Sequence, residues 1–482
     1  MCFRRNLSAP ISVSGELERC MTFDANWTQV LETLTPPPAG TPMVPCQHGW
    51  EFAFDDIPYP TIVTEREWVC DAASNVPTAQ SIFFVGSLLG GALFGWMADE
   101  YGRVPAFMAA NLLGGIGGIA TIFTSGVWDF IICRFIVGMA YDNCFTMLYI
   151  LGLEYVGPKH RTMMAALSIA IFFGGACMAL PWLALWIGDW RKLLWYTSVP
   201  SFIVLLAPWL LLESARWLVS RGQVNKAVKV LRKLEAINKR QIPDDLMDEF
   251  IVSSKTQKNK NESLLALFKS PLLLKTAILM VIVYMGCAIV FDALVRLSGS
   301  FGLDFFITFT VTSATEVPSV LLLAFILDRW GRRTLSWLPL STSTILIFVT
   351  MFVPKGIPQV SLAVLARFFM NMGYCAVMQW GTEILPTGFR ASGSSILHMS
   401  GYTATMMSPF VVYTEKIWSR LPFAIMTVVI GLAAGLSLML PETNGLPMPQ
   451  TVADGEKIIR EQSLCGKPED DKGGPYKMSR IV

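Results

Sequence analysis

Long stretches of almost purely apolar residues dominate the hydropathy pattern of this chain, and short polar segments separate them. A helix needs about 20 apolar residues to cross roughly 30 Å of hydrocarbon. The runs are continuous and lack the alternation of barrel strands, so they predict membrane-spanning helices. In the first half the predicted spans are 80–98, 105–125, 128–152, 163–187 and 192–211. In the second half they are 271–296, 300–327, 334–353, 358–382, 391–413 and 418–440.

Six residues recur at one fixed offset, which indicates two similar halves. Asp99 and Asp328, for example, are 328 − 99 = 229 residues apart. The same offset relates Gly102, Arg103, Glu154, Arg161 and Glu213 to Gly331, Arg332, Glu383, Arg390 and Glu442. Repeated bundles in membrane chains commonly flank a central site and rock against each other. The pattern therefore predicts an all-α membrane protein with two pseudo-symmetric helix bundles, and it favours a transporter.

The fixed offset also shows which predicted spans of the two halves correspond. Asp99 follows the first predicted span of its half, whereas Asp328 follows the second span of the other half. Span 271–296 is therefore left without a counterpart. We expect about 11 of twelve transmembrane helices to be present in this sequence, with the first absent, and a shortened isoform is the simplest interpretation.

Composition agrees with a membrane protein and argues against several other classes. Hydrophobic residues make up 53% of the 482 residues and charged residues only 15%, far from a soluble average. The three histidines are far apart, and no Cys or His pair has metal-ligand spacing. No phosphate-binding Gly-Lys-Ser/Thr motif occurs, and a net charge of +2 does not suggest nucleic-acid binding. We expect no enzyme activity, no cofactor and no metal.

Charge and composition divide the chain into five parts. Segment 213–270 holds 12 Lys and Arg against 7 Asp and Glu, and positive loops stay on the cytoplasmic side. We therefore expect a multi-pass protein, in the plasma membrane, with a cytoplasmic C-terminus. The expected parts are an extracellular domain (1–78), an incomplete first bundle (79–212), a cytoplasmic loop with short helices (213–270), a second bundle (271–440) and a cytoplasmic tail (441–482).

Residues 1–78 have further features of an extracellular domain. Asn6 and Asn26 stand in the Asn-x-Ser/Thr pattern of glycosylation acceptors. Cys20, Cys46 and Cys70 are disulfide candidates. With Cys2 nearby, several pairings are open, and the sequence does not choose among them.

Two loop motifs follow predicted spans at equivalent places in the halves. Residues 95–103 read GWMADEYGR and residues 327–333 read LDRWGRR. Both resemble the loop motif of the major facilitator superfamily. Glycine allows a tight backbone at a helix end, while Asp and Arg pair with charges and helix termini. We expect these residues to latch onto the neighbouring bundle, and more weakly in the first half, where Glu100 and Val104 replace basic residues.

Other strings narrow the resemblance. The segment with Cys46, Gly49-Trp50, Trp68 and Cys70-Asp71, followed by QSIFFVG at 80–86, is similar to the organic cation/anion/zwitterion transporter family (solute carrier family 22). The endings at Glu213–Arg216 and Pro441–Thr443 resemble those of sugar and organic-ion transporters. The resemblance covers about 40–445. It implies a secondary transporter of small organic cations or zwitterions that works by alternating access.

Charges inside predicted spans are costly and usually functional. A carboxylate beside aromatic rings suits an ammonium group, and the substrate-binding candidates on this basis are Glu316, Asp292, Asp142, Phe291 and Tyr284. The resemblance adds Tyr402 to these candidates. Arg134 and Arg367 open similar Arg-Phe strings. We assign them a conformational role, which they share with the repeat residues and Arg216. The alternative interpretation is that each acid pairs with an arginine and only holds helices together.

The resemblance also bears on the charge of the solute. Tyr402 stands where cation carriers have aspartate and anion carriers have arginine, and Val320 replaces a lysine of the anion carriers. Glu316 matches the family's acidic position. This favours a small organic cation or zwitterion as the partner, with a coupled ion left open. The alternatives are an organic anion transporter of the same family and a truncated isoform that does not transport.

Overall fold

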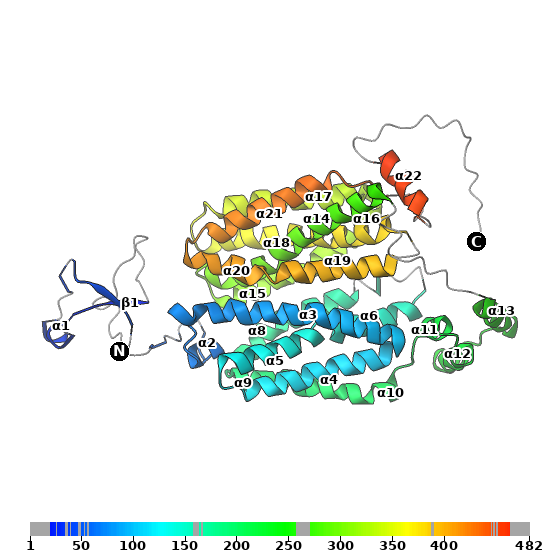
Figure 1. Cartoon of the computed structure of the whole chain (residues 1–482), viewed down its shortest axis with the longest axis horizontal. Coiled ribbons are helices and arrows are strands. Elements are labelled where there is room, and N and C mark those ends of the chain that lie inside the picture. Colours follow the sequence, from blue (N-terminus) through cyan, green and yellow to red (C-terminus); the bar gives the residue numbers. More distant parts are fainter. Residues whose placement is uncertain are drawn as a thin grey trace.

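A computed structural model describes residues 20–25, 27–33, 37–38, 40–46, 50–52, 54, 57–157, 163–164, 167–256, 270–386, 390–444, 446, 449 and 452–462. Two helix bundles lie side by side (Figure 1). A small N-terminal segment lies beyond one end of the bundles, near α2, and the helices of the central loop lie at the other end. We call these ends the N-segment face and the loop face.

A short ribbon and a disulfide tie the described part of the N-terminal segment together. Strands β1 (Met21–Phe23) and β2 (Met43–Pro45) pair antiparallel, with Thr22 opposite Val44. A disulfide joins Cys20 to Cys70, which selects one of the pairings that the sequence left open. The segment also holds α1 (Trp27–Thr33), α2 (Ile62–Glu65) and a 3-10 turn, Cys70–Ser74.

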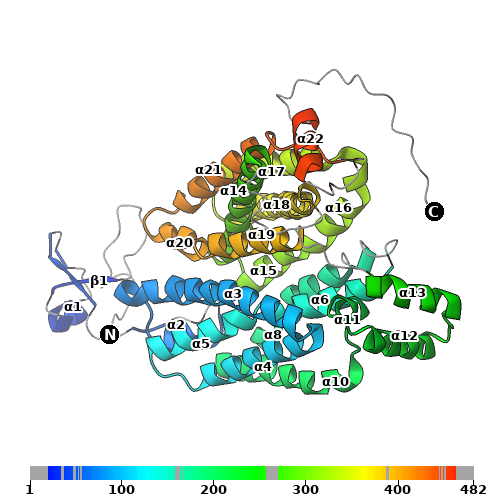
Figure 2. The ribbon, with the colours of Figure 1, turned by 45° about the vertical axis from the view of Figure 1, so that its right-hand side comes forward.

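The first bundle is built from residues 75–210. Its elements are α3 (Asn75–Glu100), α4 (Arg103–Ile122), α5 (Val127–Ala140), α6 (Asn143–Tyr155), a π-helical turn (Ile169–Gly174), α8 (Gly175–Ile187), α9 (Trp190–Ser198), a 3-10 stretch (Val199–Leu206) and α10 (Ala207–Leu210). The central loop follows with α11 (Ala215–Ser220), α12 (Val224–Asn238) and α13 (Asp244–Thr256). Figure 2 shows these three helices at the loop face.

The second bundle contains the largest apolar core, which includes Tyr284, Trp380 and Met426. Its elements are α14 (Pro271–Arg296), two 3-10 turns (Leu297–Ser300 and Thr414–Lys416), α15 (Phe305–Ala314), α16 (Glu316–Trp330), α17 (Arg332–Thr350), α18 (Ile357–Ile384), α19 (Arg390–Thr405), α20 (Ser408–Tyr413) and α21 (Leu421–Ser437). A last helix, α22 (Val452–Gln462), lies against this bundle at the loop face. It packs there through Ile459.

Helices occupy all of the eleven predicted ranges as far as the structure describes them. Within the described residues, eight helical segments are long and apolar enough to cross a membrane. The three other ranges hold α17, α19 with α20, and α21. Several predicted spans are not single helices, however. Range 128–152 is interrupted between α5 and α6, and range 300–327 is interrupted at Thr315.

The bundles touch each other along two seams. Helix α3 packs against α19 and α20, and α15 packs against α8. Ser81 donates a hydrogen bond to the carbonyl of Met406 (2.7 Å), and the Trp182 indole donates to the Thr310 hydroxyl (3.0 Å). These polar contacts join the halves nearer the N-segment face than the loop face.

Candidate substrate site between the bundles

Asp142 lies where the first bundle interrupts its helix, between α5 and α6. Its backbone carbonyl accepts hydrogen bonds from the amides of Phe145 and Thr146, and Asp142 is the N-cap residue of α6, which begins at Asn143. The Thr146 hydroxyl donates to its carboxylate at 3.0 Å. Tyr402 of α19, in the other bundle, lies within electrostatic range of the carboxylate. Among the described residues no arginine or lysine pairs with Asp142, so this acid meets the opposite bundle without a counter-ion.

A column of aromatic rings lies in the second bundle beside this acid. Tyr284 of α14 stacks on Tyr374 of α18 with ring centroids 5.1 Å apart, and Phe291 stacks on the other side of Tyr374 at 5.0 Å. The two tyrosine hydroxyls share a hydrogen bond of 2.8 Å. His398 of α19 meets Tyr284 edge-on, with centroids 6.3 Å apart. Stacked rings of this kind form a rigid apolar wall with hydroxyl groups at its edge.

Glu316 and Arg367 form a buried ion pair at the other end of the column. A guanidinium nitrogen lies 2.7 Å from a carboxylate oxygen, and the two side chains are only 1% (Arg367) and 6% (Glu316) exposed. The guanidinium also covers the ring of Phe291, 3.6 Å from its centroid, and donates to the Phe291 carbonyl. Glu316 begins α16 directly after the interruption at Thr315. The helix break thus presents the carboxylate to α18.

Asp292 is paired as well, at the end of α14 that lies at the N-segment face. Arg296, one turn later, contacts its carboxylate at 3.3 Å and also donates to the side chain of Gln80 on α3. The same guanidinium lies 5.6 Å from the Phe84 ring centroid. Asp292 therefore orients an arginine that crosses between the bundles.

The six substrate-site candidates thus fall into different environments. Asp142 faces Tyr402. The rings of Tyr284 and Phe291 belong to the aromatic column. Glu316 and Asp292 each pair with an arginine. Sequence reasoning missed three nearby residues, Tyr374, His398 and Gln80. Tyr374 lies 90 residues from Tyr284, and no pattern in the sequence links the two. Arg134, a conformational candidate, lies against the Phe130 ring at 5.3 Å.

The first repeat cluster lies at the loop face and explains the glycine and glutamate of the motif. Gly102 has φ +112°, and a Cβ there would come within 2.4 Å of the Glu213 carboxylate. That carboxylate accepts hydrogen bonds from the amides of Arg103 (3.0 Å) and Val104 (3.1 Å). It therefore neutralises the positive N-terminus of α4. Arg103 itself contacts Asp99 at 2.9 Å and Glu154 at 3.7 Å.

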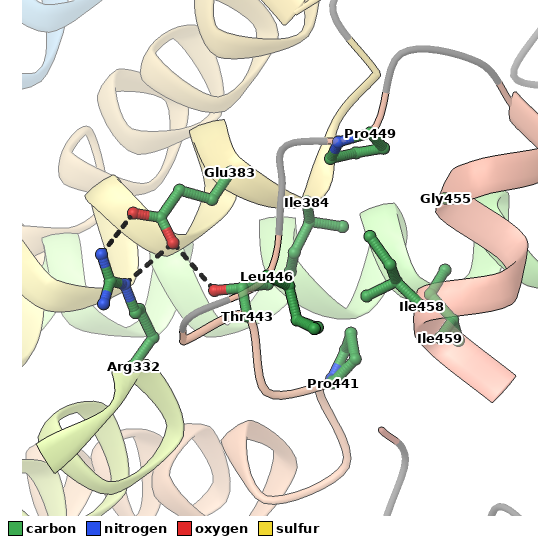
Figure 3. Close-up of a pocket in the computed structure, with 10 residues that line it drawn as sticks. All are labelled: Arg332, Glu383, Ile384, Pro441, Thr443, Leu446, Pro449, Gly455, Ile458 and Ile459. Carbon is green, nitrogen blue, oxygen red and sulfur yellow. Dashed lines mark hydrogen bonds and ion pairs between the residues drawn. The ribbon is translucent and has the colours of Figure 1, made fainter. Parts of the chain in front are cut away.

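The second cluster repeats this arrangement and is drawn in Figure 3. Gly331 has φ +83°, and the Glu442 carboxylate accepts from the amides of Arg332 (2.9 Å) and Arg333 (3.0 Å). Figure 3 shows Glu383 between Arg332 and Thr443. A cavity of about 100 Å³ separates this cluster from Ile458 and Ile459 of α22.

The partners in both clusters differ from the expectation at one point. The loop motifs were expected to reach the neighbouring bundle, but every described contact of Arg103 and Arg332 lies within its own half. The carboxylates of Glu213 and Glu442 accept hydrogen bonds from helix N-termini of their own bundle. Arg216 is exposed on α11. Arg161, Asn6 and Asn26 lie outside the described residues, as do the side chains of Asp328 and Arg390.

Known proteins resemble the chain over most of its length. Solute carrier family 22 member 3 of Rattus norvegicus is 29% identical over 439 residues, which cover 89% of this chain and 78% of the relative. Organic cation transporter 1 of Caenorhabditis elegans is 28% identical over 480 residues, with 96% of this chain and 80% of the relative covered. Organic cation transporter protein of Drosophila melanogaster is 28% identical, with 99% and 87% covered.

Solved structures confirm the fold. The proton:xylose symporter XylE of the major facilitator superfamily, bound to 6-bromo-6-deoxy-D-glucose, superposes with a TM-score of 0.60 at 20% identity, over 78% of this chain and 88% of that one. An inward-open form of XylE gives 0.61 at 18% identity, over 81% and 91%. The family model "Sugar (and other) transporter" matches residues 46–451. The chain therefore belongs to the sugar (and other) transporter family, with the major facilitator fold that its sequence predicts, and it is a membrane transporter.

Proposed function

We propose that this chain carries small organic cations or zwitterions across the plasma membrane by alternating access. Its relatives include proteins named organic cation transporters. The observation that supports the proposal most is Asp142, a carboxylate between the bundles without an arginine or lysine partner among the described residues. An ammonium group would supply the missing positive charge, and the ring of Tyr402 beside the carboxylate favours the same ligand.

The contacts between the bundles are consistent with a rocking motion. Hydrogen bonds join the halves near the N-segment face, while the charged clusters at the loop face close within each half. We propose that the N-segment face is extracellular, because the positive loop helices belong on the cytoplasmic side. A monovalent cation gains about 2.3 kcal/mol per 100 mV of membrane potential. That gain allows accumulation without ATP, and a coupled ion is not required for it.

The test is uptake by the full chain reconstituted in proteoliposomes, with an imposed membrane potential. The probes are radiolabelled benzyltrimethylammonium and phenylacetate, which share a phenyl ring and carry opposite charges. The variant is Asp142→Asn, and the matched control is Asp245→Asn, which removes an exposed acid on α13. We expect saturable uptake of the cation, with at least about a tenfold loss in Asp142→Asn, equivalent to about 1.4 kcal/mol, and no loss in the control.

Other outcomes would favour other functions. Uptake of phenylacetate alone, unchanged in Asp142→Asn, would replace the proposal with an organic anion carrier. No saturable uptake of either probe by protein of normal fold would favour a membrane protein that does not transport. Equal cation uptake by wild type and Asp142→Asn would remove Asp142 from the site.

A further inference from the structure

We propose that Glu316 sets the charge selectivity of the transporter as the counter-ion of Arg367, and does not bind the substrate directly. The inference rests on the proposed cation transport and concerns the same site. Arg367 then acts as an internal cation that Glu316 must neutralise before an external cation can bind at Asp142. Both are positioning residues in this scheme, since neither contacts the solute.

The geometry of the pair supports this role. The guanidinium occupies the ring face of Phe291 and lies 2.7 Å from the Glu316 carboxylate. These are the two groups, an aromatic face and an acid, that would otherwise attract a substrate ammonium. Arg367 already fills that position from within the protein. The pair is also almost fully buried, so water provides little screening of either charge.

The remaining hydrogen-bonding capacity of Arg367 points in the same direction. Its two terminal nitrogens donate to Glu316 and to the carbonyl of Phe291. Its Nε is buried and has no hydrogen-bond partner among the described residues. The guanidinium thus pairs with one carboxylate, has a second acid (Asp292) within electrostatic range, and still has an unused donor. If the charge of Glu316 were removed, this group would offer a carboxylate both a full positive charge and free donors.

The aromatic column connects the pair to the proposed substrate position. Phe291, Tyr374 and Tyr284 stack in sequence, with ring centroids 5.0 and 5.1 Å apart. Tyr284 is within electrostatic range of Asp142. An uncompensated Arg367 would therefore raise the positive potential at the same site, oppose cation binding and favour anions. Glu316 and Asp142 then have separate tasks, one compensating an internal charge and the other binding an external one.

The decisive experiment compares Glu316→Gln with the double variant Glu316→Gln/Arg367→Met. Uptake of benzyltrimethylammonium is measured in proteoliposomes, together with its inhibition by phenylacetate. We expect the single variant to lose at least about tenfold in cation uptake, about 1.4 kcal/mol, and to become sensitive to phenylacetate. The double variant removes both charges and keeps an apolar side chain of similar length. Replacing a buried pair in this way is often tolerated, so we expect cation uptake to recover to within about threefold of wild type.

Several results would overturn the inference. If the double variant is folded and still as inactive as Glu316→Gln, the carboxylate is needed in its own right and binds the substrate. If Glu316→Gln loses cation uptake without becoming sensitive to phenylacetate, the pair has only a structural role. Failure of the proposed function is distinguishable from both, because wild-type protein would then not transport the cation at all. Thermal unfolding of each purified variant shows whether it is folded.

Discussion

The two loop-face clusters have the same repeat residues but differ in how well they are paired. In the second bundle Arg332 binds Glu383 through two nitrogens, at 2.9 and 3.0 Å, with both side chains 11% exposed. In the first bundle Arg103 approaches Glu154 only to 3.7 Å, and both are 18% exposed. The Nε of Arg103 and one oxygen of Glu154 are buried without a hydrogen-bond partner among the described residues. The first cluster is therefore the looser of the two.

Two positions outside the motif account for this difference. Thr443 donates to Glu383 at 2.8 Å, and the Asn444 side chain accepts from Arg332 at 2.9 Å. At an offset of 229 residues the first half has Ser214 and Ala215. The Ser214 hydroxyl caps α11 by accepting from the Trp217 amide, and alanine has no polar group. The same ion pair can therefore differ in strength between the two halves because the neighbouring residues differ. The relative strength of the two clusters stays a prediction.

The largest expected effect on stability comes from removing the glutamate that pairs with the repeat arginine, Glu383 in the second cluster and Glu154 in the first. Glu383→Gln removes the charge of a largely buried carboxylate that pairs with Arg332 at 2.9 Å and should lower the free energy of unfolding by about 3 kcal/mol. The equivalent Glu154→Gln removes a longer, more exposed contact and should cost about 1 kcal/mol or less. Thermal unfolding in detergent measures both. Equal losses in the two variants would contradict the difference between the bundles.

A smaller effect on stability is expected from exchanging the residues at the equivalent positions 444 and 215. Asn444→Ala removes one hydrogen bond to a charged group and should destabilise the second cluster by about 1.5 kcal/mol. Ala215→Asn offers the first cluster an equivalent acceptor and should stabilise it by up to about 1 kcal/mol. The same unfolding assay applies, and Arg103→Met combined with Ala215→Asn, compared with Arg103→Met alone, is the control. A gain that persists in the combined variant at full size would show that the asparagine acts elsewhere.

The smallest expected effect is a pH dependence of stability that comes from Glu65 at the N-segment face. Glu65 of α2 accepts hydrogen bonds from Arg191 and from the Trp190 indole (2.8 Å) at the start of α9. The bond from Arg191 lowers the pKa of Glu65 below its ordinary value of 4.5. The folded state therefore gains stability from this carboxylate above pH 4.5, and the gain is lost as pH falls through the lowered pKa.

This pH effect is isolated by difference. We expect wild type to unfold at a higher temperature than Glu65→Gln near pH 7, and the difference to shrink towards zero near pH 3. The contribution of the carboxylate to the free energy of unfolding should be about 1 kcal/mol or less. A difference that grows on acidification would contradict the assigned sign.

Sequence patterns predicted the architecture well because hydropathy and the repeat are properties of residue order. All eleven ranges hold helices within the described residues, and Gly102 and Gly331 of the loop motifs have the positive φ that a tight turn requires. The roles of Glu213 and Glu442 were less visible. Each caps a helix that begins about 110 residues earlier in the chain, and only the fold brings the two together.

The candidate site was predicted only in part, for a similar physical reason. Asp142 and Tyr402 were both named, but whether an intramembrane acid has a counter-ion depends on which helices pack together. Glu316 and Arg367 are 51 residues apart on α16 and α18, and their pairing follows from the packing of those helices. The interruption at Asp142 was missed because the apolar run continues through it.

The most direct test of the whole account is equilibrium binding of labelled benzyltrimethylammonium to the purified chain. We expect saturable binding by wild type. For Asp142→Asn we expect a dissociation constant at least about tenfold larger, equivalent to a loss of about 1.4 kcal/mol in binding free energy. Equal affinities for the two folded proteins would contradict the claim that an acid without a counter-ion, held between two bundles, binds the transported cation.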